Sequence, residues 1–167
     1  MKLVMDYDRR SAVVYAHRWA YSRNPLYYNY DDIGGDCTNF ASQCLFAGSG
    51  IMNFTPTYGW YYINANQKAP AWTGVTYLYN FLTRSANSVG PKARECRINE
   101  LMPGDLVQLS YTEREFHHSP VVVAVSAPFR PRDILVAAHT DDSDYRPLST
   151  YPYRKIRFLH VEGVIRP

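Results

Sequence analysis

Residues 33–45 read IGGDCTNFASQCL, and the interpretation of the whole chain starts from this stretch. Gly34 and Gly35 allow backbone conformations that other residues avoid, and Asp36 is a good N-cap for a helix that follows. Such a helix places Cys37 in its first turn, where free N–H groups and the helix dipole favour a thiolate and can receive an oxyanion. The stretch is therefore a candidate nucleophile site, although a buried structural cysteine after a turn fits it as well.

The length and composition predict one folded domain over residues 1–167. The 167 residues are 46% hydrophobic and 15% aromatic, which is ample for a core and excludes general disorder. Three cysteines do not make a closed disulfide framework. Cys37 and Cys44 would lie roughly 10 Å apart on one helix, too far to bridge. We expect free thiols, with Cys37 the most reactive because its pKa is depressed, and with Cys44 buried and inert.

The charge pattern restricts the partners. A net charge of +3 without a basic run suits an anionic surface such as a bacterial wall but is too small for nucleic-acid binding. No apolar run reaches the ~18 residues of a membrane span, and the stretch from Met1 to Met5 is too short for a signal peptide's apolar region. Two locations stay open: the cytoplasm, or the cell wall or extracellular space if the chain is a domain of a longer exported protein. The sequence leaves the oligomeric state open.

Apolar periodicity divides the chain into a helical first half and a β-rich second half. Short connections between the strands predict an antiparallel meander rather than βαβ units. The expected fold class is α+β, with N-terminal helices packed on a C-terminal antiparallel sheet. Helices are predicted over 7–21, from Cys37 to 48–50 and over 75–86, and strands over 106–109, 119–125, 134–138 and 155–165.

Residues 51–73 have no periodicity and carry several aromatic side chains among Gly and Pro. This composition predicts a long ordered loop, and such loops are often functional. Trp60 and Trp72 are candidate walls of a groove for sugar or peptide, or they fill the core.

A cysteine nucleophile needs a base, and the strand pattern points to two histidines. His118 opens the second predicted strand and His139 closes the third, so antiparallel pairing brings the two side chains to one edge of the sheet. One imidazole would take the thiol proton and the other would orient it, as in a catalytic triad. Asp141 or Asp142, directly after His139, is an alternative orienting group.

The other three histidines are weaker candidates. His117 alternates with His118 along the chain and should face the opposite side, so it is the poorer base. We expect His160, inside the last strand, to be a satisfied core or interface residue. We expect His17, on the first helix, to be a surface or packing residue.

Several stretches also carry a family resemblance. In order, GDCTNF (35–40), LMPGDLVQL (101–109), His118 before a valine run and VAAH (136–139) resemble the landmarks of the papain-like NlpC-type cell-wall peptidases. A likeness from about residue 7 to 163 is closer. DCTNFASQC (36–44), AWTGV (71–75) and AHTDD (138–142) resemble the related bacterial family described as "putative amidase domain".

The resemblance implies a papain-like, NlpC-type fold and hydrolysis of an amide bond, most often in bacterial wall peptides. It implies Cys37 as nucleophile, His118 as base and His139 as the third polar residue. Thr38 and Asn39 depart from the NlpC-type pattern, which usually has a small residue such as Ser and then Gly or a similar residue. This departure concerns the substrate more than the mechanism.

Three classes of function are consistent with these residues. The favoured one is a cysteine amidohydrolase or peptidase acting on peptidoglycan peptides without a cofactor, and an acyltransferase using the same cysteine is its nearest variant. The second is a binding module on the same fold. The presence of all three polar residues, Cys37, His118 and His139, argues against it. The third is a metal site made of Cys37, His118, His139 and Asp141. It lacks a close ligand pair of the usual spacing, so we expect no metal.

Overall fold

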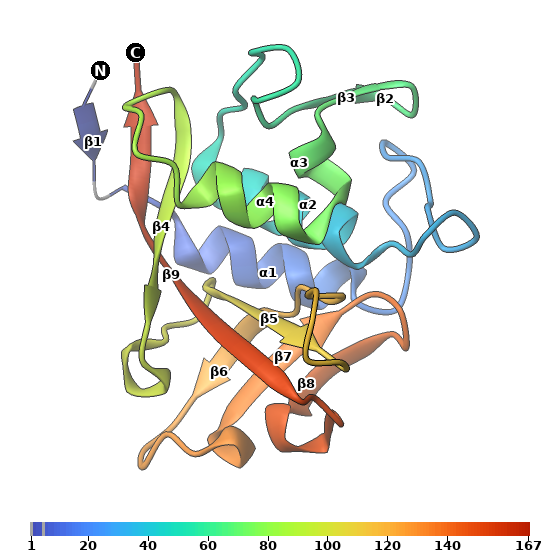
Figure 1. The fold of residues 1–167 in the computed structure, drawn as a ribbon, viewed down its shortest axis with the longest axis vertical. Coiled ribbons are helices and arrows are strands. Elements are labelled where there is room, and N and C mark those ends of the chain that lie inside the picture. Colours follow the sequence, from blue (N-terminus) through green and yellow to red (C-terminus); the bar gives the residue numbers. More distant parts are fainter. Residues whose placement is uncertain (1, 5) are drawn as a thin grey trace.

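The computed structural model describes residues 2–4 and 6–167, with side chains described from residue 6 onward (Figure 1). Helices lie on one side of a large antiparallel sheet, which confirms the α+β class. The helices are α1 (Arg9–Trp19), α2 (Cys37–Ser49), α3 (Pro70–Thr73) and α4 (Val75–Leu82). The strands are β1 (Lys2–Val4), β2 (Tyr62–Asn64), β3 (Gln67–Lys68), β4 (Gly90–Cys96), β5 (Leu106–Ser110), β6 (Val121–Val125), β7 (Ile134–Ala138), β8 (Ser143–Pro147) and β9 (Lys155–Arg166).

The main sheet has seven strands in the order β1-β9-β5-β6-β7-β8, with β4 also paired to β9. All of its pairs are antiparallel. Strands β5 to β8 follow one another along the chain and across the sheet, so the predicted meander is confirmed. The long strand β9 then returns beside β5 and crosses the sheet diagonally (Figure 1).

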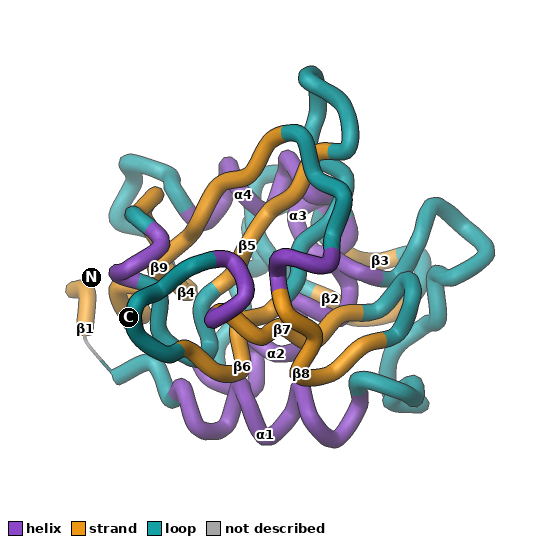
Figure 2. The backbone as a smooth tube through the Cα atoms, turned by 90° about the horizontal axis from the view of Figure 1, so that it is seen from below, coloured by secondary structure: helices purple, strands orange, loops and turns teal. Residues whose placement is uncertain are grey.

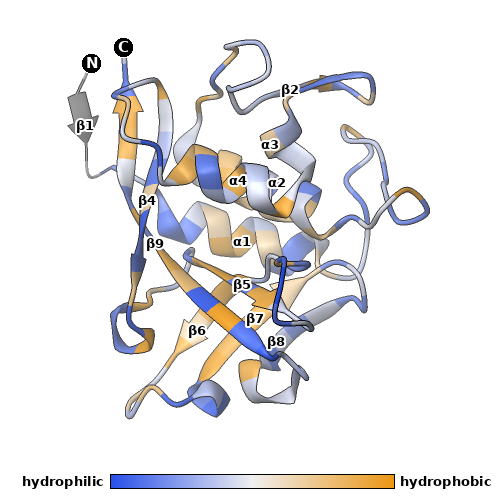
Figure 3. Ribbon diagram, in the orientation of Figure 1, coloured by the Kyte–Doolittle hydropathy of each residue, from blue (hydrophilic) through white to orange (hydrophobic). Residues whose placement is uncertain are grey.

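Both faces of the sheet are covered. On one face, α1 and α2 lie against each other and both contact β7, while α4 lies against β4 (Figures 1 and 2). Leu106 of β5 belongs to the core under these helices, whereas Val107 and Leu109 belong to a second core on the other face. Every residue of β5 is therefore buried, and β6 and β7 are also largely hydrophobic (Figure 3).

The predicted elements differ from the structure in several places. Helix α2 begins at Cys37 as predicted and ends at Ser49, and the capping residue Gly50 has a φ of 68°, the left-handed conformation that glycine favours. Helix α4 ends at Leu82 rather than at residue 86. The expected loop 51–73 contains the β2–β3 hairpin and α3. The strands β4 and β8 were not predicted, because their polar residues give no hydrophobic alternation.

A buried carboxylate ties α1 to the sheet. Asp105 accepts hydrogen bonds from the Arg9 guanidinium (2.7 Å) and from the backbone N–H of Val161 (2.9 Å). The Nδ1 atom of His160 lies 2.9 Å from the same carboxylate, so the prediction that His160 is a satisfied residue is confirmed. His17 also packs as expected, stacked on the Tyr145 ring. None of the described helices is long and apolar enough to cross a bilayer.

Candidate active site

Cys37, the first residue of α2, lines a pocket of about 390 Å³ at the end of the sheet. The volume is in the range of small-molecule and peptide sites. The pocket walls come from the loop before α2, the segment after β5, the loop between β7 and β8, the end of β8 and the segment after it. The lining residues are Gly34, Gly35, Cys37, Tyr111, His117, His118, Thr140, Asp141, Arg146, Tyr151 and Pro152.

Cys37 is 7% exposed, and its thiol donates a hydrogen bond to the carbonyl oxygen of His117 at 3.7 Å. Burial raises the pKa of Cys37, and hydrogen bonds from Thr38 and from the backbone N–H of Ser119 offset this only in part. The prediction that the helix start depresses this pKa was therefore wrong in its net direction. Cys44 is buried as expected, and burial raises its pKa well above the usual value.

His118 lies just before β6, and its side chain lines the same pocket although the residue is only 4% exposed. Burial lowers the pKa of His118 to about 4, and the charge of Arg146 acts in the same direction while that of Asp141 opposes it. No side chain or backbone group among residues 6–167 hydrogen-bonds either ring nitrogen. His118 is therefore a neutral imidazole at pH 7 that is free to accept a proton.

His117 also lines the pocket, but its ring lies on the outer wall. The ring stacks on Tyr111 with the two planes 1° apart, and its Nε2 lies 3.7 Å from Glu115. Its backbone carbonyl, rather than its imidazole, meets the Cys37 sulfur.

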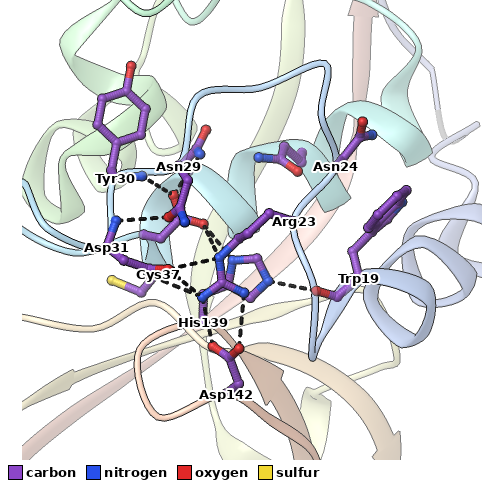
Figure 4. Close-up of polar contacts among 12 residues, drawn as sticks. Trp19, Arg23, Asn24, Asn29, Tyr30, Asp31, Cys37, His139 and Asp142 are labelled. Carbon is purple, nitrogen blue, oxygen red and sulfur yellow. Dashed lines mark hydrogen bonds and ion pairs between the residues drawn. The ribbon is translucent and has the colours of Figure 1, made fainter.

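His139 has partners other than His118 (Figure 4). Its Nδ1 lies 2.5 Å from the Asp36 carboxylate and its Nε2 lies 2.7 Å from the carbonyl oxygen of Trp19. Both ring nitrogens of His139 are thus occupied by Asp36 and Trp19. The expected contact between His139 and His118 is therefore absent from the described structure. Val121 pairs with Ala137, and this register continued by two residues places Ser119, not His118, opposite His139.

Asp36 is the N-cap residue of α2, yet its side chain makes no capping hydrogen bond to the backbone of the helix. It accepts from the backbone N–H of Tyr30 and from Asn39 Nδ2, each at 2.9 Å, besides contacting His139. The carboxylate thus joins the loop before α2, the helix and the end of β7. Arg23, 3.6 Å from Asp36, adds a positive charge beside this group (Figure 4).

The loop after β7 brings Asp141 to the pocket. Asp142 is held by Arg23 at 2.9 Å and Asp144 by His17 at 2.8 Å. Between β7 and these anchors, Thr140 and Asp141 have positive φ values of 65° and 54°, a strained conformation for residues with a side chain. The loop fixes Asp141 close enough to His118 for its charge to raise the histidine's pKa.

Trp60 and Trp72 do not line this pocket, so their expected role as groove walls is wrong. Both are 0% exposed, and their ring centroids lie 4.9 Å apart in the core. Their indole N–H groups donate to Ser42 Oγ (3.0 Å) and Asn39 Oδ1 (2.9 Å) of α2. A buried tryptophan needs an apolar environment for its ring and an acceptor for its indole N–H, and both residues have the two. Trp60 and Trp72 therefore pack against α2 in the core.

The tyrosines that line the pocket are Tyr111 and Tyr151. Asp141 supplies a negative charge to the lining and Arg146 a positive one. The sequence interpretation missed the two tyrosines and Arg146, since they lie in polar segments without a motif. No cluster of three His, Cys, Asp or Glu side chains with metal-binding geometry occurs in the part of the chain that the structure describes.

The site thus combines Cys37 at a helix start with the buried imidazole of His118 in the lining of one pocket. Residues 6–161 match the family described as "Putative amidase domain", and the chain belongs to this family. It is also 34% identical over 165 residues to "Uncharacterized protein YhbB" from Bacillus subtilis (strain 168). That match covers 93% of this chain and 50% of the relative, so the chain spans about half the length of that protein. No solved structure matches.

Proposed function

We propose that the protein is a cysteine-dependent amidohydrolase or peptidase that cleaves amide bonds in bacterial cell-wall peptides. The observation that carries the proposal is the shared pocket of Cys37 and His118 at the N-terminus of α2. Membership of the amidase-domain family supports amide hydrolysis. The resemblance to NlpC-type peptidases supports a wall peptide as the substrate and a papain-like fold.

The proposed reaction begins with two neutral groups. His118 takes the proton of the Cys37 thiol, and the sulfur attacks the carbonyl carbon of the scissile amide. The first-turn N–H groups of α2 have no partner within the helix and stabilise the oxyanion. His118 then returns the proton to the leaving amine. Water, with His118 again as base, hydrolyses the thioester and restores the thiol.

We assign the orienting role to Asp141 rather than to His139. The charge of Asp141 acts on His118, whereas both nitrogens of His139 are already occupied. A carboxylate also stabilises an imidazolium better than a second imidazole does. The proposed function of His139 is to hold Asp36 and the start of α2.

Digestion of purified cell wall, with mass analysis of the released fragments, tests the proposal. Cys37→Ala and His118→Ala should each remove activity by a factor on the order of 10² to 10⁴, because the nucleophile or its base is lost. His117→Ala is the matched control and should retain activity within about tenfold, since its ring is on the outer wall. Peptide fragments with new carboxylates indicate a hydrolase, whereas fragments joined to an added amine indicate an acyltransferase.

Two results contradict the proposal. One is wall binding without any fragment from the wild-type protein, which would make the chain a binding module. The other is full activity of Cys37→Ala. If Asp141 orients His118, Asp141→Asn should slow the reaction without changing the fold. An unaffected rate would show that another residue orients His118.

A further inference from the structure

Arg146 places a positive charge in the pocket without a negative partner. Its Nε and Nη2 donate to Thr150 at 2.8 and 3.1 Å, and its guanidinium carbon lies 3.6 Å from the centre of the Tyr151 ring. In the described part of the chain no carboxylate lies within ion-pair distance of Arg146. Since a guanidinium has five N–H donors, Nη1 remains available to a ligand.

Tyr151 supplies a second donor with no acceptor. Its hydroxyl is the one buried side-chain oxygen or nitrogen of residues 6–167 that lacks a hydrogen-bond partner of good geometry, although Ser143 and Arg146 lie close enough to lower its pKa. A buried hydroxyl without a partner is unfavourable, so such groups are rare unless a ligand completes them. Tyr151 and Arg146 line the same pocket as Cys37.

The charges around this corner of the pocket favour an anion. Arg146 is near enough to lower the pKa of His118 as well as that of Tyr111. Asp141 is the opposing charge and, like Arg146, it forms no ion pair within the described residues. The free Nη1 of the Arg146 guanidinium and the Tyr151 hydroxyl are two donors that match the oxygen atoms of a carboxylate.

We propose that Arg146 and the Tyr151 hydroxyl bind a carboxylate of the substrate next to the scissile amide. The substrate class is then a peptide whose residue at the cleaved bond carries a free carboxylate. This inference rests on the proposed function, since it places the carboxylate relative to Cys37. Arg146 determines specificity and takes no proton.

Alkylation of Cys37 tests the inference without a hydrolysis assay. Iodoacetate and iodoacetamide transfer similar groups to the thiolate with loss of iodide, but only iodoacetate carries a carboxylate. The ratio of the two rates at Cys37, read by peptide mapping, cancels any change in the fraction of thiolate. Arg146→Gln should lower the iodoacetate-to-iodoacetamide ratio about three- to tenfold, because the anionic reagent loses its ion pair.

Arg132→Gln is the control for net charge, since Arg132 is exposed and outside the pocket. This control should leave the ratio unchanged. Arg146→Lys should retain part of the wild-type ratio, and Tyr151→Phe should lower the ratio by a smaller factor than Arg146→Gln does. An Arg146→Gln ratio equal to that of the wild type overturns the carboxylate site and leaves the proposed function standing. A Cys37 that neither reagent modifies overturns both.

A pair of wall peptides gives the second readout. Amidation of the carboxylate next to the cleaved bond should raise KM for the wild-type protein by about tenfold, and should have little effect on Arg146→Gln. Equal sensitivity of the two proteins to amidation contradicts the assignment.

Discussion

At the scale of single residues, the environment of His118 decides both its chemistry and its effect on stability. A general base must be unprotonated in the free enzyme, and a buried imidazole with a pKa of about 4 meets this condition throughout the neutral range. Cys37 is buried as well, and its raised pKa keeps it a thiol. Cys37 and His118 are therefore both uncharged at neutral pH, and in the proposed mechanism the proton is transferred only after the substrate binds.

The depressed pKa of His118 predicts a loss of stability in acid. The unfolded chain takes up a proton near pH 6.5, whereas the folded chain does so only near the pKa of about 4. The unfolded state therefore binds more protons between these values, and this contribution to stability falls as the pH falls through that window. Between pH 7 and 4.5 the group should account for about 2 kcal/mol of the decrease in the free energy of unfolding.

His118→Gln removes this titration. Urea unfolding at both pH values should show a smaller acid loss for the variant than for the wild type. The exposed His117→Gln, which keeps His118, serves as the control and should follow the wild type. Parallel decreases in His118→Gln and the wild type would show that His118 is not held neutral by the fold.

At the scale of elements, the start of α2 is fixed by a chain of contacts that links three elements. Asp36 at the head of α2 contacts His139 at the end of β7, and His139 contacts the Trp19 carbonyl at the end of α1. Phe40 stacks on the same imidazole with a centroid distance of 4.1 Å. The position of Cys37 relative to the sheet therefore depends on a buried polar pair.

A double-mutant cycle on Asp36→Asn and His139→Asn measures this link. Each single change should destabilise the fold by about 3 kcal/mol, because it leaves one buried partner uncompensated. The coupling energy should be on the order of 1–3 kcal/mol, and Cys37 alkylation should change in each variant. The pair His17 and Asp144, with side chains 29% and 10% exposed, is the control and should couple by less than about 1 kcal/mol. Additive changes at Asp36 and His139 would contradict the linkage.

The same elements show what the sequence could predict. The helix start at Cys37 and the strand after His118 follow from local patterns, namely the glycine pair and the β-branched run. The partner of His139 does not, because it depends on the register of β6 against β7 and on a carboxylate far away in the chain. Trp60 and Trp72 were ambiguous for a similar reason, since composition alone cannot distinguish a pocket wall from the support behind it.

At the scale of the whole molecule, the pocket lies where the two halves of the chain meet. The helical half supplies Cys37, and the sheet supplies His118, Asp141 and Arg146. Strand β5, buried on both faces between the two cores, is the common support. A helix-first, sheet-second order predicted this division, but the polar strand β8, which carries Arg146, had no signal in the sequence.

The first and last strands of the sheet lie side by side, with Lys2 paired to Arg166 and Val4 to Val164 (Figure 1). The chain can therefore be circularly permuted: a linker of about six Gly and Ser residues would join the present ends, and new ends would open in the exposed turn 85–87. This permutant should fold cooperatively and keep the wild-type rate of Cys37 alkylation. Opening the chain inside β6, between Val122 and Val123, should abolish folding. Failure of the first permutant would mean that the covalent order of the helical and β halves is itself required, beyond the contacts that join them.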